Sequence, residues 1–303
     1  MITLRQIQYA VALAKTGHFG RAAERCHVTQ PGLSQQIRQL EELCGAPLFD
    51  RLGKSVRLTP LGREFIERAR PILEQAEALE SFLAGHDGRP TRPLRFGLIP
   101  TVAPYLLPDI YPALQAEWPD IGFTVVETRT EALIEALDDG TLDLALIASE
   151  PREGWPRMAC APLFADDFVL ATGTDEPAGA PVRLHAIDRD RMLLLDEGHC
   201  FRDQIIAVCG LGPEVSRRTF AATSLSTIVE FVAAGQGITL LPEIALRKEA
   251  IGNRIAIHRL ASPGAMRLLT LAWRDGSPFA DLFREVADII RRARPAPAQV
   301  SNG

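Results

Sequence analysis

The first sixty residues carry apolar side chains at helical spacing, which predicts a cluster of short helices. Five apolar positions predict a first helix that ends at Gly17: Leu4, Ile7, Ala10, Val11 and Ala14. A short second helix is expected through residues 21–24. A third helix is expected to start at Thr29, a residue type suited to capping, and to bury a stripe formed by Leu33, Ile37 and Leu40.

The third helix leaves amide, hydroxyl and guanidinium groups on its outer face, near its start. Two short helices with a tight turn between them, the second carrying such groups outward, are typical of a helix-turn-helix that reads double-stranded DNA. Residues 49–59 predict a hairpin with a glycine turn, and its basic residues would form a wing beside the groove. The predicted DNA-contacting residues are Thr29, Gln30, Pro31, Ser34, Gln35, Arg38, Arg51 and Lys54. The alternative is a surface helix of mixed polarity in an unrelated bundle.

A near-heptad pattern of apolar residues follows and predicts one long helix with a partner helix. Its members are Leu61, Phe65, Ala69, Ile72, Ala76, Leu79 and Leu83. Pro71 falls inside this pattern, where a proline costs about 3 kcal/mol, so a kink or a break between two helices is expected there. The glycine- and proline-rich residues 85–93 predict a hinge. An exposed helix without a partner is the alternative for this segment.

The rest of the chain alternates strand-like and helix-like segments, which predicts α/β layers with mainly parallel sheets. Strands are expected at residues 94–99, 123–127, 142–147, 169–171, 192–195, 237–241 and 268–273. Helices are expected at residues 104–117, 130–138, 225–234 and 281–294. Ligands of such folds lie near the carboxyl ends of strands and the N-termini of helices.

Charge separates the first part of the chain from the remainder. The 303 residues, enough for two or three domains, carry a net charge of −5. Residues 1–70 hold 11 Lys and Arg against 6 Asp and Glu, which leaves 22 against 32 for the remainder. This polarity suits DNA binding by the first part alone. No apolar run approaches a membrane span and the first residues lack a signal-peptide pattern, so a cytoplasmic protein without membrane contact is expected.

Two cysteines, Cys200 and Cys209, stand nine residues apart in the segment 198–210. If this segment is one helix, nine residues rise about 13.5 Å and turn about 900°, so the two side chains face opposite sides. A disulfide needs Cα atoms within roughly 7 Å. Helix and disulfide would therefore exclude each other, as in a two-state redox switch. The remaining cysteines are interpreted as small buried side chains: Cys26, Cys44 and Cys160.

No metal and no cofactor are expected. Only Cys200, Cys209 and His199 cluster in the sequence, and adjacent residues chelate zinc poorly. The chain also lacks a Cys-x-x-Cys motif, a Gly-x-Ser-x-Gly elbow and a phosphate-cradling Gly-Lys-Ser/Thr loop, so an enzyme is not expected. A solute-binding protein is disfavoured by the predicted DNA-binding module.

The residues 22–41, 48–51 and 58–62 closely resemble the N-terminal domain of LysR-type transcriptional regulators. The resemblance covers roughly residues 3–65. It implies an α-helical winged helix-turn-helix (1–60), a dimerising linker helix with its hinge (61–88) and a two-lobed α/β regulatory domain like the periplasmic binding proteins (89–303). The subdomains would be about 89–163 plus 269–303, and 164–268, with the chain crossing between them near 162–166 and 266–269. It also implies a homodimer or homotetramer, promoter DNA as partner and contact with RNA polymerase.

Within that family the chain is similar to the peroxide sensors of the OxyR type. The similarity lies in residues 97–108, in 198–204 together with Cys209, and in 223–242. It implies a transcription activator in which hydrogen peroxide oxidises Cys200 and Cys209 then forms a disulfide with it. The implied peroxide pocket consists of Thr101, Thr130, His199, Asp203 and Arg267. The alternative within the family is a regulator that binds a small metabolite in the cleft between the lobes, with structural cysteines.

Overall fold

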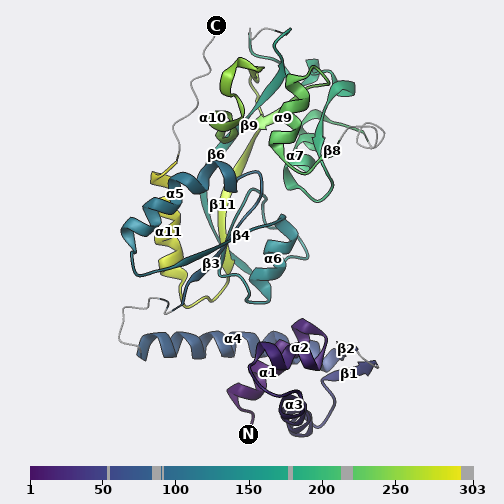
Figure 1. The fold of residues 1–303 in the computed structure, drawn as a ribbon, viewed down its shortest axis with the longest axis vertical. Helices are drawn as coiled ribbons and strands as arrows, with labels where there is room; N and C mark the ends of the chain where they lie inside the picture. Colours follow the sequence, from purple (N-terminus) through teal and green to yellow (C-terminus); the bar gives the residue numbers. More distant parts are fainter. Residues whose placement is uncertain (53–54, 84–89, 91, 177–179, 213–220, 295–303) are drawn as a thin grey trace. The chain divides into compact units, whose positions relative to one another are not determined.

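The computed structural model describes residues 1–52, 55–83, 90, 92–176, 180–212 and 221–294. The chain forms two compact units, one of residues 1–91 with 276–279 and one of residues 92–275 with 280–303 (Figure 1). None of the helices in the described ranges has the length and apolar character needed to cross a membrane.

The first unit contains the predicted short helices and hairpin. Its elements are α1 (Leu4–Thr16), α2 (Phe19–Arg25), α3 (Gln30–Cys44), β1 (Phe49–Leu52), β2 (Ser55–Leu58) and α4 (Pro60–Leu83). Gly17 ends α1 in the left-handed conformation, with φ 59°. Leu33, Ile37 and Leu40 are fully buried in the core of this unit, which confirms the predicted apolar stripe of α3. Strands β1 and β2 pair antiparallel, from Phe49 opposite Leu58 to Leu52 opposite Ser55.

Helix α4 runs from Pro60 to Leu83 as a single helix with Pro71 inside it. The expected break between two helices is therefore wrong. Pro71 is exposed, so the turn before it that lacks a hydrogen bond faces solvent rather than the core. Ile66 and Ala69 attach the first half of the helix to the core of the unit, with exposures of 3% and 2%.

The second unit contains a mixed sheet rather than the mainly parallel one that was expected. The strand order is β10-β6-β11-β5-β3-β4, with β9 also paired to β6. Its strands are β3 (Leu94–Leu98), β4 (Phe123–Glu127), β5 (Leu144–Ile147), β6 (Met158–Gly173), β9 (Thr239–Pro242), β10 (Ile255–Arg259) and β11 (Met266–Arg274). Strand β3 pairs parallel with β4 and β5, while the pairs made by β6 and β11 are antiparallel.

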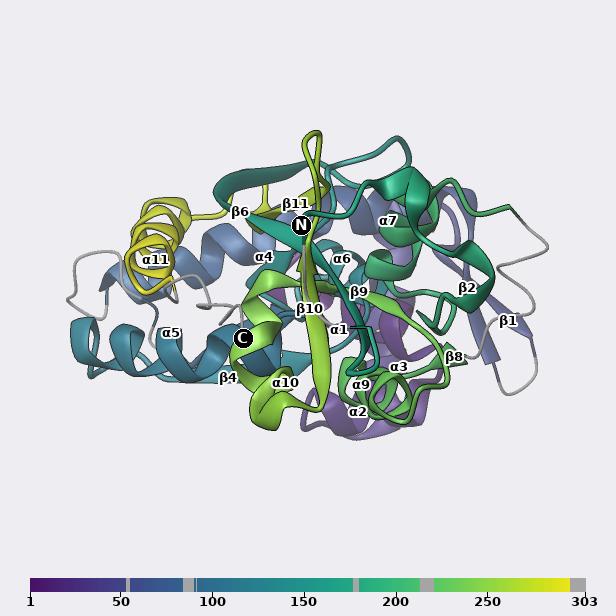
Figure 2. The same cartoon turned by 90° about the horizontal axis from the view of Figure 1, so that it is seen from above.

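The long strands β6 and β11 explain the antiparallel pairing. They lie side by side from Met266 opposite Asp167 to Arg274 opposite Met158, and β6 continues from there into the second lobe, where it pairs with β9 and β10 (Figures 1 and 2). One strand carries the chain out of the first lobe and the other brings it back, so their directions are opposite. Strand β6 is much longer than the predicted 169–171, and β10 was not predicted.

Helices cover both lobes. In the first lobe α5 (Ala103–Glu117) and α11 (Ala280–Arg292) pack together on one side of the sheet, and α6 (Thr130–Asp138) packs on the other (Figure 1). The second lobe adds α7 (Cys200–Cys209), α9 (Leu225–Ala233), α10 (Leu246–Glu249) and the short parallel pair β7 (Leu194–Leu195) and β8 (Ala221–Ala222). Tyr105, from α5 of the first lobe, is buried in the core of the second.

Candidate functional site

The start of α3 presents polar side chains on an exposed surface. Thr29 is the N-cap, as expected, since its Oγ1 accepts a hydrogen bond from the Gly32 backbone N–H at 3.3 Å, and Pro31 occupies the first turn. Gln30, Pro31, Gln35 and Arg38 are exposed and Ser34 is half-buried. Exposed amide and guanidinium groups at a helix start can donate to base edges and to phosphates.

The hairpin is tied to the helices beside it. Glu41 of α3 accepts hydrogen bonds from the backbone N–H groups of Leu48 and Phe49, at 2.9 and 3.0 Å. The Val56 N–H donates to the Gly17 carbonyl at 2.9 Å. The predicted wing residue Lys54 lies outside the described residues, and for Arg51 only the backbone, within β1, is described. These bonds fix the base of the hairpin relative to α1 and α3.

Cys200 and Cys209 are the first and last residues of the same helix, α7. Gly210 ends the helix in the left-handed conformation, with φ 59°. Cys200 is half-buried, whereas Cys209 is 1% exposed, and burial raises the pKa of the Cys209 thiol. The two thiols are free in this structure, separated by the length of the helix. The first thiol is thus reachable from solvent and the second is not.

A buried arginine connects α7 to the crossing strands. Arg267 of β11 donates from Nε to Asp166 Oδ2 on β6 at 2.9 Å, and both side chains are fully buried. It also donates to Oγ1 and to the backbone carbonyl of Thr101, at 2.8 and 2.9 Å. Its guanidinium carbon lies 5.1 Å from the ring centroid of Phe201, the residue after Cys200. A permanent positive charge is therefore held beside the start of α7.

A second set of contacts positions the residues that precede α7. His199 Nε2 lies 2.9 Å from Asp196 Oδ1, and burial lowers the pKa of His199, so its ring is neutral at pH 7. Asp196 also accepts a hydrogen bond from Arg129 at 2.6 Å. Gly198 has φ +88°, and a Cβ there would lie 3.0 Å from Arg129 Nη1. Arg129 is the N-cap residue of α6, so the loop before Cys200 is joined to the start of that helix.

The two predicted threonines are buried and neither caps a helix. Thr101 and Thr130 are 3% and 4% exposed. Val102 and Arg129 are the N-cap residues of α5 and α6, and neither makes a side-chain cap bond. Thr130 Oγ1 has no hydrogen-bond partner among the described residues. Helix capping therefore does not account for either threonine.

Asp203 differs from the other predicted pocket residues because it is exposed on α7. The next residue, Gln204, instead donates from Nε2 to the Ala148 carbonyl at 2.5 Å, which ties α7 to the first lobe just after β5. The structure thus brings Thr101 and Arg267 into direct contact. It places His199 at the helix start and leaves the Asp203 carboxylate toward solvent.

Two family models match the chain in succession. Residues 4–63 match the bacterial regulatory helix-turn-helix protein of the lysR family, and residues 87–295 match the LysR substrate binding domain. The chain belongs to the LysR family. The members of this family are transcriptional regulators rather than enzymes.

Full-length relatives place this LysR-family chain with the OxyR-type, peroxide-inducible transcription activators. The hydrogen peroxide-inducible genes activator of Dickeya chrysanthemi is 37% identical over 96% of this chain and 95% of its own length. The DNA-binding transcriptional dual regulator OxyR of Escherichia coli K12 is 36% identical over 96% of this chain and 95% of its own length. The resemblance to OxyR-type regulators that the sequence suggested is confirmed.

Solved structures of OxyR proteins support the same grouping. A full-length OxyR from Pseudomonas aeruginosa, with a cysteine replaced by aspartate, has a TM-score of 0.80 and 34% identity over 96% of this chain and 98% of that one. A hydrogen peroxide-bound cysteine-to-serine mutant of Corynebacterium glutamicum OxyR has a TM-score of 0.63 and 35% identity, covering 96% and 92%. The winged helix-turn-helix and the two-lobed LysR-type regulatory fold are thereby confirmed.

Sequence reasoning missed the residues that hold this LysR-type site together. Asp166 orients Arg267, and Asp196 orients His199. Gln204 ties α7 to the first lobe. Asp166 was detectable, because it and Asp167 are carboxylates between apolar residues of the crossing segment, where a buried charge requires a partner. Gln204 gave no comparable signal, since its backbone acceptor cannot be read from side-chain types.

Proposed function

We propose that this protein senses hydrogen peroxide through Cys200 and transmits the oxidation to its DNA-binding unit. The observation that carries this proposal is the start of α7, where a half-buried cysteine stands beside Phe201 and the buried Arg267. The Cys200 thiolate would attack one oxygen of the peroxide and break the O–O bond. The sulfur then becomes a sulfenic acid, and the departing hydroxide takes up a proton to leave as water.

The proposed peroxide pocket is formed by Thr101, Thr130, His199, Asp203 and Arg267. Because Thr101 Oγ1 accepts a hydrogen bond from Arg267, its own O–H remains a donor and is polarised by the guanidinium charge. Thr130 Oγ1 is buried without a partner among the described residues, so a peroxide oxygen would satisfy it. The positive charge of Arg267 would also stabilise the hydroxide as it leaves. Asp203 belongs to the rim of such a pocket rather than its interior.

Cys209 is the proposed resolving residue. Its thiol would attack the sulfenic sulfur of Cys200, form the disulfide and release water, which balances the reaction. The helix separates the residues by a rise of about 13.5 Å, while a disulfide requires Cα atoms within roughly 7 Å. Cys209 is also buried, which keeps it from reacting early. The disulfide therefore requires α7 to unwind, and the new bond would stabilise the unwound form.

The output of this switch is proposed to be altered binding of promoter DNA by residues 1–60. The contacting residues would be Thr29, Gln30, Pro31, Ser34, Gln35, Arg38, Arg51 and Lys54. Residues 61–88 would then serve as linker helix and hinge, and residues 89–303 as the regulatory domain, with subdomains 89–163 plus 269–303 and 164–268. Transcription activation in the cytoplasm would further involve RNA polymerase.

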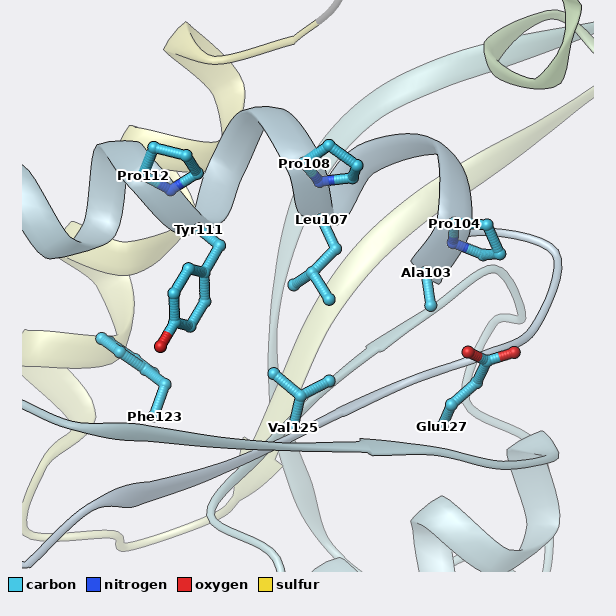
Figure 3. Close-up of a pocket in the computed structure, with 9 residues that line it drawn as sticks. All are labelled: Ala103, Pro104, Leu107, Pro108, Tyr111, Pro112, Phe123, Val125 and Glu127. Atoms are coloured by element: carbon cyan, nitrogen blue, oxygen red, sulfur yellow. The ribbon is translucent and has the colours of Figure 1, made fainter. Parts of the chain in front are cut away.

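A homodimer or homotetramer is proposed, supported by two apolar surfaces. In the first unit a groove of about 440 Å³ lies between the start of α1 and α4, and Leu4, Leu61 and Ile72 on it are 48%, 41% and 46% exposed. In the second unit a groove of about 670 Å³ lies between α5 and the edge strand β4. Figure 3 shows Phe123 and Val125 of β4 pointing toward Leu107 and Tyr111 of α5. A second copy of the chain that packed on each groove would remove this apolar surface from water.

The sensing proposal is tested by mapping thiols in the full-length protein. Reduced protein is treated with a small excess of hydrogen peroxide, then alkylated, digested and analysed by mass spectrometry. A Cys200–Cys209 bridge is expected to form while Cys26, Cys44 and Cys160 remain alkylatable. In Cys200→Ser the bridge and the transcriptional response should both be lost, whereas Cys160→Ser should behave as wild type. An unchanged response in Cys200→Ser would favour a metabolite bound between the lobes instead.

The DNA-binding proposal has a separate test. Arg38→Ala is expected to weaken operator binding by about five- to hundredfold, since one base or phosphate contact is worth about 1–3 kcal/mol. Its Cys200 oxidation rate should not change, because the reacting site lies in the other unit. Arg254→Ala, which removes an exposed arginine of the second unit, is the matched control. Intact, specific binding by Arg38→Ala would show that the recognition face is assigned wrongly.

A further inference from the structure

A cavity of about 490 Å³ opens at the surface of the second lobe, at the C-terminal end of α7, where Arg183, His185 and Arg189 are exposed. One wall is the last turn of α7 with Cys209 and Gly210, and the turn at residues 261–263 forms another. Two 3-10 turns complete the lining. The turn Leu184–Ala186 contributes His185, with Arg183 just before it, and the turn Arg189–Arg191 contributes Arg189 at its start. None of the lining residues belongs to the proposed peroxide pocket, and the cavity lies at the opposite end of α7 from Cys200.

The lining of this cavity is positively charged. It holds two arginines and a histidine, and among the described residues no carboxylate lines it. Neither Arg183 nor Arg189 forms an ion pair within the described part of the chain, although Arg191, Arg254 and Arg259 of the same lobe pair with Glu176, Glu230 and Glu243. The residues after 70 carry 22 basic against 32 acidic side chains. Among the described residues, two arginines that line one cavity without an ion-pair partner are therefore a local exception.

Arg189 also touches the end of the helix. A Cβ built on Gly210 would lie 3.7 Å from Arg189 Nη2, so the guanidinium is packed against the C-terminus of α7. A cation there complements the negative end of the helix dipole. Its charge acts on the neighbouring Cys209 thiol as well, where it opposes the effect of burial on the pKa. A ligand that binds Arg189 in this position therefore binds the protein while α7 is helical.

We propose that this cavity binds a phosphate group, either inorganic phosphate or a small phosphomonoester, and that the bound anion holds α7 in its helical, reduced form. Guanidinium groups match phosphate with paired hydrogen bonds, and two of them line the opening. His185 and the Ser262 hydroxyl supply further donors. The volume exceeds that of inorganic phosphate, which leaves room for a small organic substituent.

The coupling to α7 follows from linkage and rests on the function proposed above. Unwinding of α7 removes a wall of the cavity, so the unwound form cannot bind the ligand in this way. A ligand that binds one form only lowers the population of the other by the factor 1 + [L]/Kd. At a ligand concentration ten times Kd, disulfide formation should therefore slow about tenfold.

The binding is measured by calorimetry on the reduced full-length protein, with inorganic phosphate and with glycerol 3-phosphate as probes, at constant ionic strength set with chloride. Wild type is compared with the double variant Arg183→Gln/Arg189→Gln and with Arg254→Gln, which removes an exposed charge elsewhere in the lobe. Any phosphate that binds to the DNA-binding unit contributes equally in all three proteins, so it does not affect the comparison between them. Saturable binding that is at least tenfold weaker in the double variant alone is expected, with partial recovery in Arg183→Gln/Arg189→Lys.

The rate of Cys200–Cys209 bridging after a peroxide pulse is measured with the same proteins. Phosphate should slow bridging in wild type and in Arg254→Gln but leave the double variant unchanged. If glycerol 3-phosphate binds more tightly than inorganic phosphate, the ligand is a phosphomonoester. If the two probes bind equally, the ligand is inorganic phosphate. Unaltered binding in a folded double variant overturns the site, and binding without any effect on bridging overturns the coupling. Absence of the bridge in every protein would instead refute the sensing proposal, while the binding data still decide the site.

Discussion

A single buried ion pair determines where the positive charge of the proposed sensing site lies. The Arg267 and Asp166 side chains are both fully buried, and Asp166 also accepts a hydrogen bond from the Ile244 N–H at 3.0 Å. Burial raises the pKa of Asp166, while its two hydrogen-bond donors favour the ionised form. A buried charge is tolerated when a partner and hydrogen bonds satisfy it. The same ion pair fixes Arg267 where it contacts Thr101, so the location of the guanidinium charge depends on the Asp166 carboxylate.

Asp166→Asn should therefore destabilise the second unit by about 3 kcal/mol, because it keeps the side-chain shape but leaves Arg267 as an unbalanced buried charge. Urea unfolding followed by fluorescence measures the change. Asp167→Asn is a matched control, since Asp167 is the exposed neighbour on the same strand, and its effect should stay within about 0.5 kcal/mol. Equal effects of the two substitutions would show that the ion pair does not stabilise the unit.

At the level of elements, helix α4 combines an exposed proline with a glycine that permits close packing. The Gly62 N–H donates to Thr59 Oγ1 at 2.9 Å, which caps the first turn. A Cβ on Gly62 would lie 2.0 Å from the Leu48 carbonyl oxygen. The start of α4 can thus lie against the chain before β1 only because residue 62 has no side chain. Further along, Pro71 is exposed and is accommodated without a break.

Gly62→Ala should consequently shift or unfold the start of α4, although alanine is the better helix former by about 1 kcal/mol. A loss of about 2 kcal/mol or more in the stability of the first unit is expected from the backbone clash, read from its thermal unfolding, together with weaker DNA binding. Gly212→Ala is the control, because a Cβ there meets no atom within 4 Å. A stabilised Gly62→Ala protein would mean that the close contact with Leu48 is not required.

Across the whole molecule, the sequence predicted individual elements better than their pairing. The apolar stripe of α3 and the cap at Thr29 are local features, set by residues within one or two turns. The mixed sheet was not predictable in the same way. Strand direction depends on how β6 and β11 cross between lobes. Pro162, Asp166 and Asp167 interrupt the apolar pattern in the middle of β6 and hide its length of 16 residues.

The same distinction holds for the candidate site. Cys200, His199 and the threonines were recognisable by motif, but the bonds of Arg267 to Asp166 and Thr101 join residues 101 and 166 positions apart. Contacts at such separations depend on tertiary packing, not on local pattern. Tyr105 is the clearest example. It lies in the predicted helix 104–117, and its position there does not indicate that it connects the lobes.

Tyr105 of α5 enters the core of the second lobe and donates its hydroxyl to Glu249 Oε1 of α10 at 2.9 Å. Glu249 is 6% exposed and also accepts from Ser226 Oγ at 2.7 Å. Tyr105→Phe removes one of these two donors to a buried carboxylate, which should cost about 1–3 kcal/mol. Because the lost bond joins the lobes, amide exchange should accelerate in α10 and the first turn of α5 before it does in β3 or β5.

Tyr111→Phe provides the comparison on the same helix, since the Tyr111 hydroxyl accepts a hydrogen bond from Gln115 Nε2 at 3.3 Å, at an exposed position. It should change stability by less than about 0.5 kcal/mol and leave exchange in α10 unaltered. If Tyr105→Phe matched this control in both measurements, the lobes would be held together mainly by β6 and β11. If it accelerates exchange as expected, a hydrogen bond 144 residues apart in sequence sets how firmly the lobe that carries α7 is joined to the lobe that carries Thr101.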